Sequence, residues 1–450
     1  IMKNSVIKIK TKDKGIFFLL GLLILLFYYR DIQDQEFSKM LFVLPLVGYS
    51  LMTNYRSTIY LIALLMPLSF GLSTGYIFPV ILMIYFFKKR EVPYKTIAFV
   101  FVLMVLEYIH YPFYPSGISI DPSTHLNYFS AWFIIAYLLY NLDKGIDINK
   151  FLSLFCIGTI VFCIFVTWHS LMIFDTTGYQ LGEARIGVVG MEDELENGKI
   201  YLRANPNTLA YFSVTAISII LVQLYRKQMN IYFAIVSLIV LVVTGGMTMS
   251  RTWFVLTGFS FIVFVMTNNR KGFKNMMISL SLLLILFIIV MTTGDFINLI
   301  AERFSGDKTM SGRTGIFDYY HNVFINNLDV FTIGTGAINY LKILGYDHAI
   351  HNGTQQILVC YGVIGFLLLM IPFARRIMML CKNRHGGGTL LYLSPIIVVL
   401  IFLQTIQSIM PHQLLFPLIP AIGVLSLKQN NSLIRGKGMV KHKQTYNQLE

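Results

Sequence analysis

Long apolar runs separated by short polar stretches make up most of this chain. The runs begin near residues 15, 40, 59, 76, 96, 127, 151, 207, 231, 252, 276, 355, 389 and 413. Several are shorter than the ~20 residues that a helix needs to cross a hydrocarbon core of about 30 Å, so flanking polar residues must extend them. The pattern predicts an all-α fold, a polytopic transmembrane helical bundle with about 12–14 spans.

The composition supports this class. The 450 residues are 56% hydrophobic and 13% charged, whereas soluble domains are about 45–50% apolar and ~25% charged. The four cysteines, Cys156, Cys163, Cys360 and Cys381, lie in or beside apolar runs and show no CxxC spacing. They therefore indicate neither a zinc site nor a disulfide framework, and we interpret them as packing residues.

The net charge of +14 follows the topology. When the runs alternate from a cytoplasmic N-terminus, most Lys and Arg fall on the inside and most acidic residues fall outside, as the positive-inside rule requires. The same alternation places the loops 110–126, 174–206 and 292–353 outside. We therefore expect a multi-pass protein of the bacterial cytoplasmic membrane with both termini cytoplasmic. The basic residues are expected to meet lipid headgroups and not nucleic acid.

The runs and loops predict five regions. We expect the first run, from Gly15 to Tyr29, to be an anchor and not a cleaved signal, because no small-residue cleavage site follows it. The regions are N-terminal transmembrane helices in 1–150, central helices with the external loop 174–206 in 151–293, a large external catalytic loop in 294–353, C-terminal helices in 354–427 and a basic cytoplasmic tail in 428–450.

Arg251 stands at a break in the apolar pattern. Two runs, 231–243 and 252–266, are separated only by Thr244-Gly-Gly-Met-Thr-Met-Ser-Arg251, which is too short to leave the membrane interface. An arginine at the bilayer centre costs about 2.5–3.5 kcal/mol, so we place Arg251 at the outer interface. There it either reaches the lipid headgroups or awaits an anionic substrate.

The longest polar interruption runs from Thr292 to Gly365 and carries Arg303, Arg313, His348 and His351. Apolar and aromatic residues after Gly312-Arg313-Thr314 predict an amphipathic helix, with Arg313 near its start, where backbone N–H groups favour anions. His351, at the opening of the next apolar run, is suited to act as a general base or to donate to a phosphate oxygen. As a metal site the HxxH spacing is weak, and we expect no metal.

Two further charged residues are candidates. Arg203 comes directly before Asn205-Pro206-Asn207, a helix-start signal in which either asparagine can cap the helix. Glu107 lies within an apolar run, where a carboxylate suggests function. It is close to the outer end of that run, however, so its carboxylate is also able to reach water.

Four stretches resemble the O-antigen polymerase/ligase superfamily, membrane glycosyltransferases that act on polyprenyl-diphosphate-linked oligosaccharides. They are RANPNTLA at 203–210, SRT at 250–252, SGR at 311–313 and HNGTQQILVCYGVIG at 351–365. The resemblance implies that Arg251 and Arg313 bind the diphosphate and that His351 activates the acceptor hydroxyl. Arg203, Arg303, His348 and Asn352 are our further candidates for substrate binding.

The chemistry of that assignment follows from the residue types. Loss of the diphosphate from the anomeric carbon develops negative charge, which arginine forks can offset by bidentate binding without a metal. No acidic pair of the DxD type occurs in the external segments, where Asp295, Asp307 and Asp347 stand singly. We therefore expect a metal-independent, cofactor-free, inverting transfer.

Several functions stay open at this point. Our first hypothesis is a polymerase of repeat units for an O-antigen, capsule or exopolysaccharide, using lipid-linked donor and acceptor and a chain-length regulator as a partner. A ligase would move the same glycan to a lipid or protein acceptor. A transporter should carry paired repeats, and the GGMTMSR break has no second copy. A non-catalytic assembly partner would tolerate loss of His351.

Overall fold

The structure is a computed structural model of the whole chain, and it describes most of the apolar runs. The described residues are 14–72, 74–110, 122–142, 145–177, 186, 202, 204–267, 313–346, 348–382, 388–406 and 412–427. Within these ranges every regular element is a helix, so the prediction of an all-α fold is confirmed. The run that begins near residue 276 lies outside the described residues.

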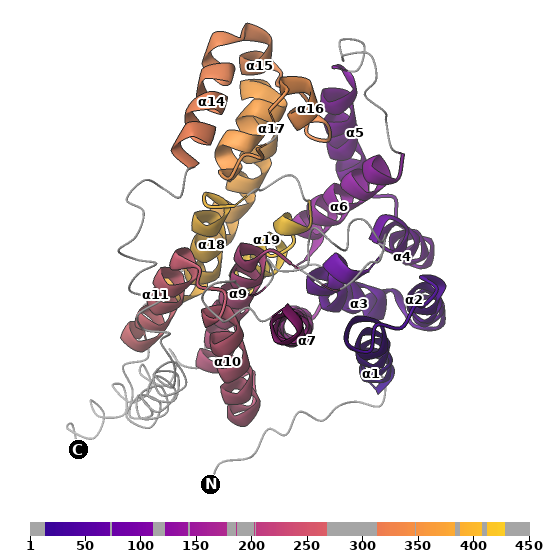
Figure 1. The fold of residues 1–450 in the computed structure, drawn as a ribbon. Coiled ribbons are helices and arrows are strands. Elements are labelled where there is room, and N and C mark those ends of the chain that lie inside the picture. The colour runs from indigo at the N-terminus through magenta and orange to yellow at the C-terminus, as the bar shows by residue number, and fades with distance from the viewer. Residues whose placement is uncertain are drawn as a thin grey trace, which may run out of the picture.

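The helices follow the apolar runs closely (Figure 1). They are α1 Lys14–Phe27, continued by the π-helical turn η2 Tyr28–Ile32, α2 Met40–Met52, α3 Tyr55–Leu68, followed by the 3-10 turn η3 Ser69–Gly71, α4 Thr74–Lys89, α5 Tyr94–Tyr108, α6 Pro122–Asn141, α7 Ile148–Thr177, α9 Pro206–Tyr225, α10 Ile231–Gly246, α11 Arg251–Thr267, α14 Arg313–Asn326, α15 Leu328–Thr332, α16 Tyr340–Leu344, α17 Gly353–Lys382, α18 Thr389–Leu403, the 3-10 turn η6 His412–Leu415, and α19 Leu418–Ser426.

Two helices form the centre of the main bundle, because they are buried on every side. The residues of α3 from Thr58 onward are buried, and so is α9 from Thr208 to Gln223. Helix α7 packs along both. Its Gly158 allows the closest approach, since a Cβ there would lie 2.2 Å from the carbonyl oxygen of Leu64 on α3. A helix that is hydrophobic all round is stable only when it is surrounded by other apolar surface.

Four helical segments are long and apolar enough to cross a membrane: Lys14–Ile32, Ile148–Ile173, Pro206–Tyr225 and Gly353–Lys382. Four shorter apolar helices, among them α10 and α11, accompany them. The last helix, α19, has 9 residues and spans only about 14 Å at 1.5 Å per residue. The apolar helices are therefore consistent with a membrane protein, while the count of 12–14 spans stays a prediction.

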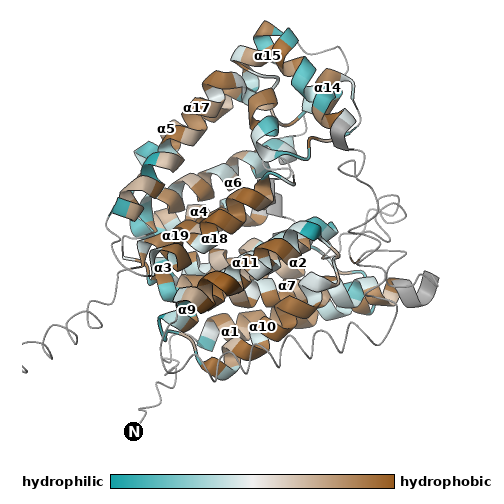
Figure 2. Ribbon diagram, turned by 90° about the vertical axis from the view of Figure 1, so that its left-hand side faces the viewer, coloured by the Kyte–Doolittle hydropathy of each residue, from teal (hydrophilic) through white to brown (hydrophobic). Residues whose placement is uncertain are grey.

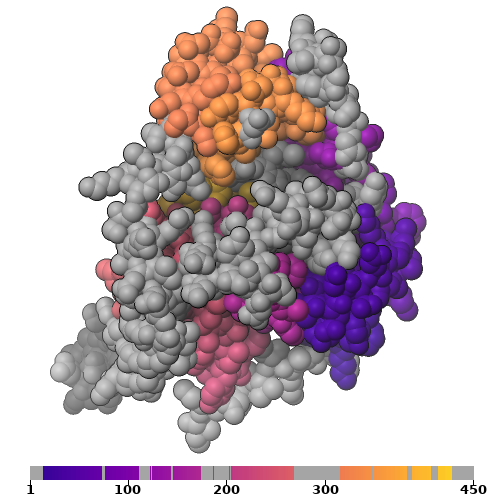
Figure 3. Space-filling model, in the orientation of Figure 1, coloured from indigo at the N-terminus to yellow at the C-terminus, as the bar shows by residue number. Residues whose placement is uncertain are grey.

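A cap of short helices covers one end of α17. It consists of α14, α15 and α16, and Figure 1 shows these three beside the first half of α17 at the top of the view. Hydrophilic and hydrophobic residues alternate on α14 and α15, whereas α9 and α18 are mostly hydrophobic (Figure 2). In the space-filling view the cap forms a lobe above the main bundle (Figure 3). We call residues 313–352 the cap.

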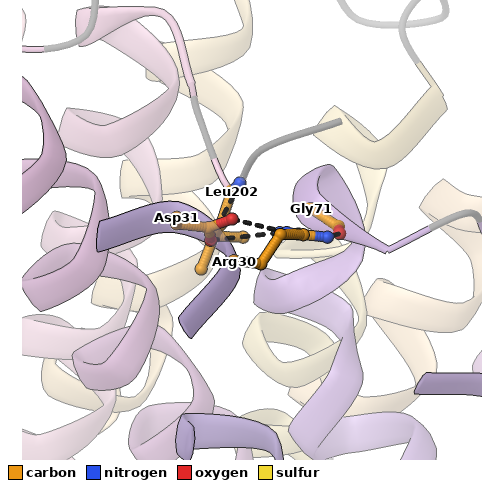
Figure 4. Close-up of polar contacts among 4 residues, drawn as sticks. All are labelled: Arg30, Asp31, Gly71 and Leu202. Carbon is orange, nitrogen blue, oxygen red and sulfur yellow. Dashed lines mark hydrogen bonds and ion pairs between the residues drawn. The ribbon is translucent and has the colours of Figure 1, made fainter. Parts of the chain in front are cut away.

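A buried ion pair joins three parts of the N-terminal half (Figure 4). Arg30 binds the carboxylate of Asp31 with Nε and Nη2, and its Nη1 donates to the carbonyl oxygen of Gly71 at 2.7 Å. The same carboxylate accepts from the backbone N–H of Leu202 at 3.2 Å. The contact at Leu202 is close, since a Cβ on Gly71 would lie 2.6 Å from the Cα of Leu202. The ion pair therefore fixes the chain four residues before α9 begins.

Candidate functional site

The first group of candidate residues lies where α9 and α11 begin. Asn205 caps α9, and its Oδ1 accepts from the N–H of Asn207 at 2.9 Å with Pro206 in the first turn. This confirms the helix start that was predicted from the sequence. Arg251 is the first residue of α11, and its side chain is partly exposed. Only four residues separate it from α10, and the left-handed backbone at Met249 (φ 51°) makes this tight turn possible.

Contacts between helices place these starts at the same end of the bundle as the start of α17. Trp253, two residues after Arg251, donates its Nε1–H to Ser213 of α9 at 2.8 Å. Two residues earlier on α9, the Tyr211 ring lies 5.2 Å from that of Phe402 in the last turn of α18. Two residues further on, Gln404 accepts from Thr354 of α17 at 2.8 Å. The candidates on α11 and α17 thus belong to one end of the helix assembly.

Helix α14 brings Arg313 to this region through its backbone. Arg313 is the first residue of α14, as predicted, and Phe317 follows one turn later. The carbonyl oxygen of Phe317 accepts from Nε2 of Gln355 in the first turn of α17 at 2.8 Å. The start of α14 therefore lies within about one turn, ~6 Å along the axis, of a direct contact with α17. The Arg313 side chain, Arg203 and Arg303 lie outside the described residues.

Two tyrosines hold the segment from His348 to Asn352. Tyr320 of α14 donates to the carbonyl oxygen of His348 at 2.7 Å, and Tyr340 of α16 accepts from the N–H of Ile350 at 3.2 Å. Burial raises the pKa of both tyrosines above the usual value, so both hydroxyls are protonated at neutral pH. The side chain of His348 is exposed and that of His351 is partly exposed. The backbone between the two histidines is thus fixed, while His348 is exposed and His351 is partly exposed.

Asn352 has a structural role that the sequence reasoning missed. Its Oδ1 accepts from the N–H of Gln355 at 2.9 Å, and its carbonyl oxygen accepts from the N–H of Gln356 at 2.8 Å. This is the N-cap geometry of a helix start, and α17 begins at the next residue. The Asn-Gly pair before an apolar run was the available signal, but the resemblance led us to assign Asn352 to substrate binding.

Substitutions at Asn352 separate these two roles. We expect Asn352→Ala to lower the free energy of unfolding by about 1 kcal/mol. Asn352→Asp should keep the N-cap hydrogen bond, because a carboxylate also accepts from the N–H of residue 355. A negative charge would, however, repel a diphosphate. Thermal unfolding of the purified variants measures the first effect, and donor binding measures the second. Equal stability of the alanine and aspartate variants would contradict the capping role.

Glu107 is the most deeply buried charged residue near the cap. Its side chain is fully buried at the end of α5. Oε2 accepts from the N–H of Ala337 at 2.7 Å, and Oε1 accepts from the N–H of Ile338 at 3.0 Å. The Tyr361 hydroxyl donates to Oε2 at 3.4 Å. From the sequence we considered two interpretations of Glu107: a role in the site, or a carboxylate that reaches water. The structure excludes exposure and places Glu107 under the cap.

The loop that Glu107 binds is interlocked with a kink in α17. Gly334 and Gly362 both have a left-handed backbone, with φ of 81° and 61°. A Cβ on Gly334 would lie 2.3 Å from the carbonyl carbon of Cys360, and one on Gly362 would lie 2.3 Å from that of Thr332. The two backbones therefore touch directly, which only glycine allows at both positions.

The kink also explains where the backbone hydrogen bonds go. At Gly362 the chain leaves helical geometry, so carbonyl groups just before it lose their partners in the next turn. Thr335 N–H donates to Val359 and Cys360, and Gly336 N–H donates to Cys360 at 2.8 Å. The loop therefore satisfies the carbonyl groups that the kink frees.

The fold and this arrangement together define a class: an all-helical protein with several helices able to cross a membrane and a polar cap over one end of its bundle. No protein-family model matches the chain, and no curated protein matches it either.

Proposed function

We propose that this protein is a membrane glycosyltransferase that polymerises polyprenyl-diphosphate-linked oligosaccharide repeat units into a surface polysaccharide. In this proposal it is a bundle of 12–14 spans in the bacterial cytoplasmic membrane, with both termini cytoplasmic and the cap outside. The observation that carries the proposal is that the candidate residues stand at helix starts, which contacts through α9 and α18 connect at one end of the helix assembly. Arg251 begins α11, Arg313 begins α14, and His351 and Asn352 precede α17.

Helix starts suit the binding of a diphosphate. Their first N–H groups have no partner within the helix, and the helix dipole adds partial positive charge. Arginine at such a position adds a permanent charge and a fork that matches two phosphate oxygens. In the proposed reaction Arg251 and Arg313 bind the leaving diphosphate as its negative charge grows. Arg203 and Arg303 extend the basic site.

The acceptor hydroxyl then needs a base. His351 is partly exposed. The backbone on either side of it is fixed by the bond of Ile350 to Tyr340 and by the N-cap hydrogen bond of Asn352. In the proposed step neutral His351 accepts the hydroxyl proton, the oxygen attacks the anomeric carbon from the face opposite the diphosphate, and the configuration inverts. His348, whose ring is exposed, contributes to acceptor binding.

Substitution of the proposed site residues tests the function. We expect His351→Ala to lower the polymerisation rate by about 10²–10⁴-fold. Arg251→Ala and Arg313→Ala should also lose polymer, and Arg251→Lys should restore little, because lysine lacks the bidentate fork. The matched control is Lys342→Ala, which removes an exposed positive charge from the same cap. Polymer length and protein level are measured in cells whose sole copy carries each variant.

Each alternative function predicts a different result in this experiment. Normal polymer in the His351 and Arg251 variants at normal protein level would refute the glycosyltransferase, and would favour a transporter or an assembly partner. Long lipid-linked chains that are no longer transferred to their final acceptor would identify a ligase instead. If the site variants only fail to extend short lipid-linked chains into long ones, the result supports the polymerase.

A further inference from the structure

We propose that Glu107 is a positioning residue: from below the cap, its buried carboxylate fixes the 334–338 loop and so places the segment that carries His348 and His351. The inference deepens the proposed function and rests on it for the role of the histidines. The mechanical part, the attachment of the loop by Glu107, rests on contacts alone.

The first step concerns the carboxylate itself. Glu107 lies in the last turn of α5, where the helix dipole disfavours a negative charge. No lysine or arginine pairs with it among the described residues. Instead, the N–H groups of Ala337 and Ile338 each donate to a different carboxylate oxygen, and Tyr361 adds a third donor. Two successive N–H groups form a small anion-binding concavity, so the loop supplies the compensation that the helix end lacks.

A second residue of the same helix end strengthens the attachment. His110, three residues after Glu107, is buried and lies close to the backbone of Ile333. Burial lowers the pKa of His110, although the backbone of Ile333 and the nearby Asp329 oppose this shift. The end of α5 therefore lies against the loop before and after Gly334, at residue 333 and at residues 337–338.

The third step leads from the loop to the histidines. Ile338 is two residues before Tyr340, which starts α16. The Tyr340 hydroxyl accepts from the N–H of Ile350 at 3.2 Å and lies 3.4 Å from Nε2 of Gln356. Ile350 directly precedes His351. A shift of the loop would therefore move Tyr340 and remove the contact that fixes the backbone next to the proposed base. An error of about 1 Å in such a position costs on the order of 10²-fold in rate.

The chemistry also explains why the residue is a glutamate. Both carboxylate oxygens accept from N–H groups, so an amide of the same shape would turn its own NH₂ group toward one of the two donors. Glu107→Gln is therefore nearly isosteric yet disrupts one of the two bonds. Among the three contacts to Glu107, Tyr361→Phe removes the longest one. The hydroxyl of Tyr361 also bonds that of Tyr128 on α6, so this variant reports on the link to α6.

Hydrogen exchange and turnover of the full-length protein in lipid nanodiscs test the inference. In Glu107→Gln we expect the N–H groups of Ala337 and Ile338 to exchange about tenfold faster or more. One of them loses its acceptor, and the other keeps only a neutral amide oxygen in place of a charged carboxylate. Exchange in α9 should not change. Turnover of the repeat-unit lipid extracted from the same cells should fall about tenfold or more per folded molecule. The control is Glu91→Gln, the same substitution at a half-exposed carboxylate paired with Lys89.

The outcomes separate the two proposals. Unchanged exchange at 337–338 would refute the attachment by Glu107, whatever the turnover. Faster exchange with unchanged turnover per folded molecule would refute the positioning role, provided that His351→Ala is inactive. If His351→Ala keeps full turnover, the proposed function fails, and the exchange result alone decides whether Glu107 holds the loop. A loss of turnover that only matches the loss of folded protein would show a structural role and overturn the inference.

Discussion

Replacement of Gly362 by alanine is expected to detach the cap from α17. At Gly362 φ is 61° and ψ is −172°, a backbone conformation that essentially only glycine adopts and that costs another residue on the order of 1–3 kcal/mol. The new methyl group would in addition lie 2.3 Å from the carbonyl carbon of Thr332, a backbone atom that no rotamer change can move. We expect the two effects together to destabilise the closed cap, relative to the open one, by about 3 kcal/mol or more.

Substitutions at two other glycines measure the cost of backbone strain separately from the cost of a steric clash. Gly345 also has a left-handed backbone, with φ of 62°, but a Cβ there would meet nothing within 4 Å. Gly345→Ala should therefore cost only the backbone strain, roughly 1–2 kcal/mol. Gly258, inside α11, has ordinary helical geometry and open space around it, so Gly258→Ala should be neutral or stabilising by up to about 1 kcal/mol.

Cysteine labelling measures this result at the place where it occurs. Cys360 is buried beside the kink, whereas Cys156 and Cys163 are buried in α7. With the partly exposed Cys381 replaced by serine, a thiol reagent should label Cys360 in Gly362→Ala at temperatures that leave the α7 cysteines protected. Simultaneous labelling of all three would contradict a local opening of the cap.

Removal of the Asp31 carboxylate is expected to have the second large effect. Its side chain is 1% exposed and that of Arg30 is 12% exposed. Asp31→Ala would leave a largely buried guanidinium and the N–H of Leu202 without this acceptor. Removing one partner of a buried ion pair typically costs 3–5 kcal/mol. We therefore expect the variant to unfold at clearly lower temperature and to label the α7 cysteines early.

The pair formed by Lys89 and Glu91 provides the control. Its glutamate side chain is 45% exposed, and exposed ion pairs contribute about 0–1 kcal/mol. Glu91→Ala should therefore leave the unfolding temperature almost unchanged. A similar loss of stability in both variants would show that burial does not set the strength of the Arg30–Asp31 pair. The double replacement of Arg30 and Asp31 by Leu should recover part of the loss, since it leaves no buried charge.

Two sets of contacts, the Arg30–Asp31 pair and the contacts of Gly334, Gly362 and Glu107, fix different parts of the fold. The Arg30–Asp31 pair fixes the chain that enters α9, next to the RANPN stretch. The interlocked glycines and Glu107 fix the cap, which carries Arg313, His348 and His351. Both sets of contacts are made to the backbone. They therefore fix the main-chain position from which each candidate side chain extends.

Much of the local structure was already determined by the sequence. Apolar periodicity located α10 and α11 on either side of the Thr244–Arg251 break. A capping asparagine located the start of α9, and the amphipathic pattern after residue 312 located that of α14. These features depend on neighbours within one or two turns, and such neighbours are visible in the chain. The number of spans was less accessible, because a 9-residue helix such as α19 and a spanning helix both appear as apolar runs.

Tertiary structure alone decided what Glu107, Gly334, Gly362 and Asp31 do. Glu107 binds residues 230 positions away along the chain, and Asp31 binds one 171 positions away. In the sequence Glu107 was an acid near the end of an apolar run, able to reach water or to take part in a site, and Gly362 entered only as part of the stretch 351–365 that carries the resemblance. The distinction arises because a buried carboxylate or a left-handed glycine is defined by the backbone that folding brings against it, and no local pattern encodes that partner.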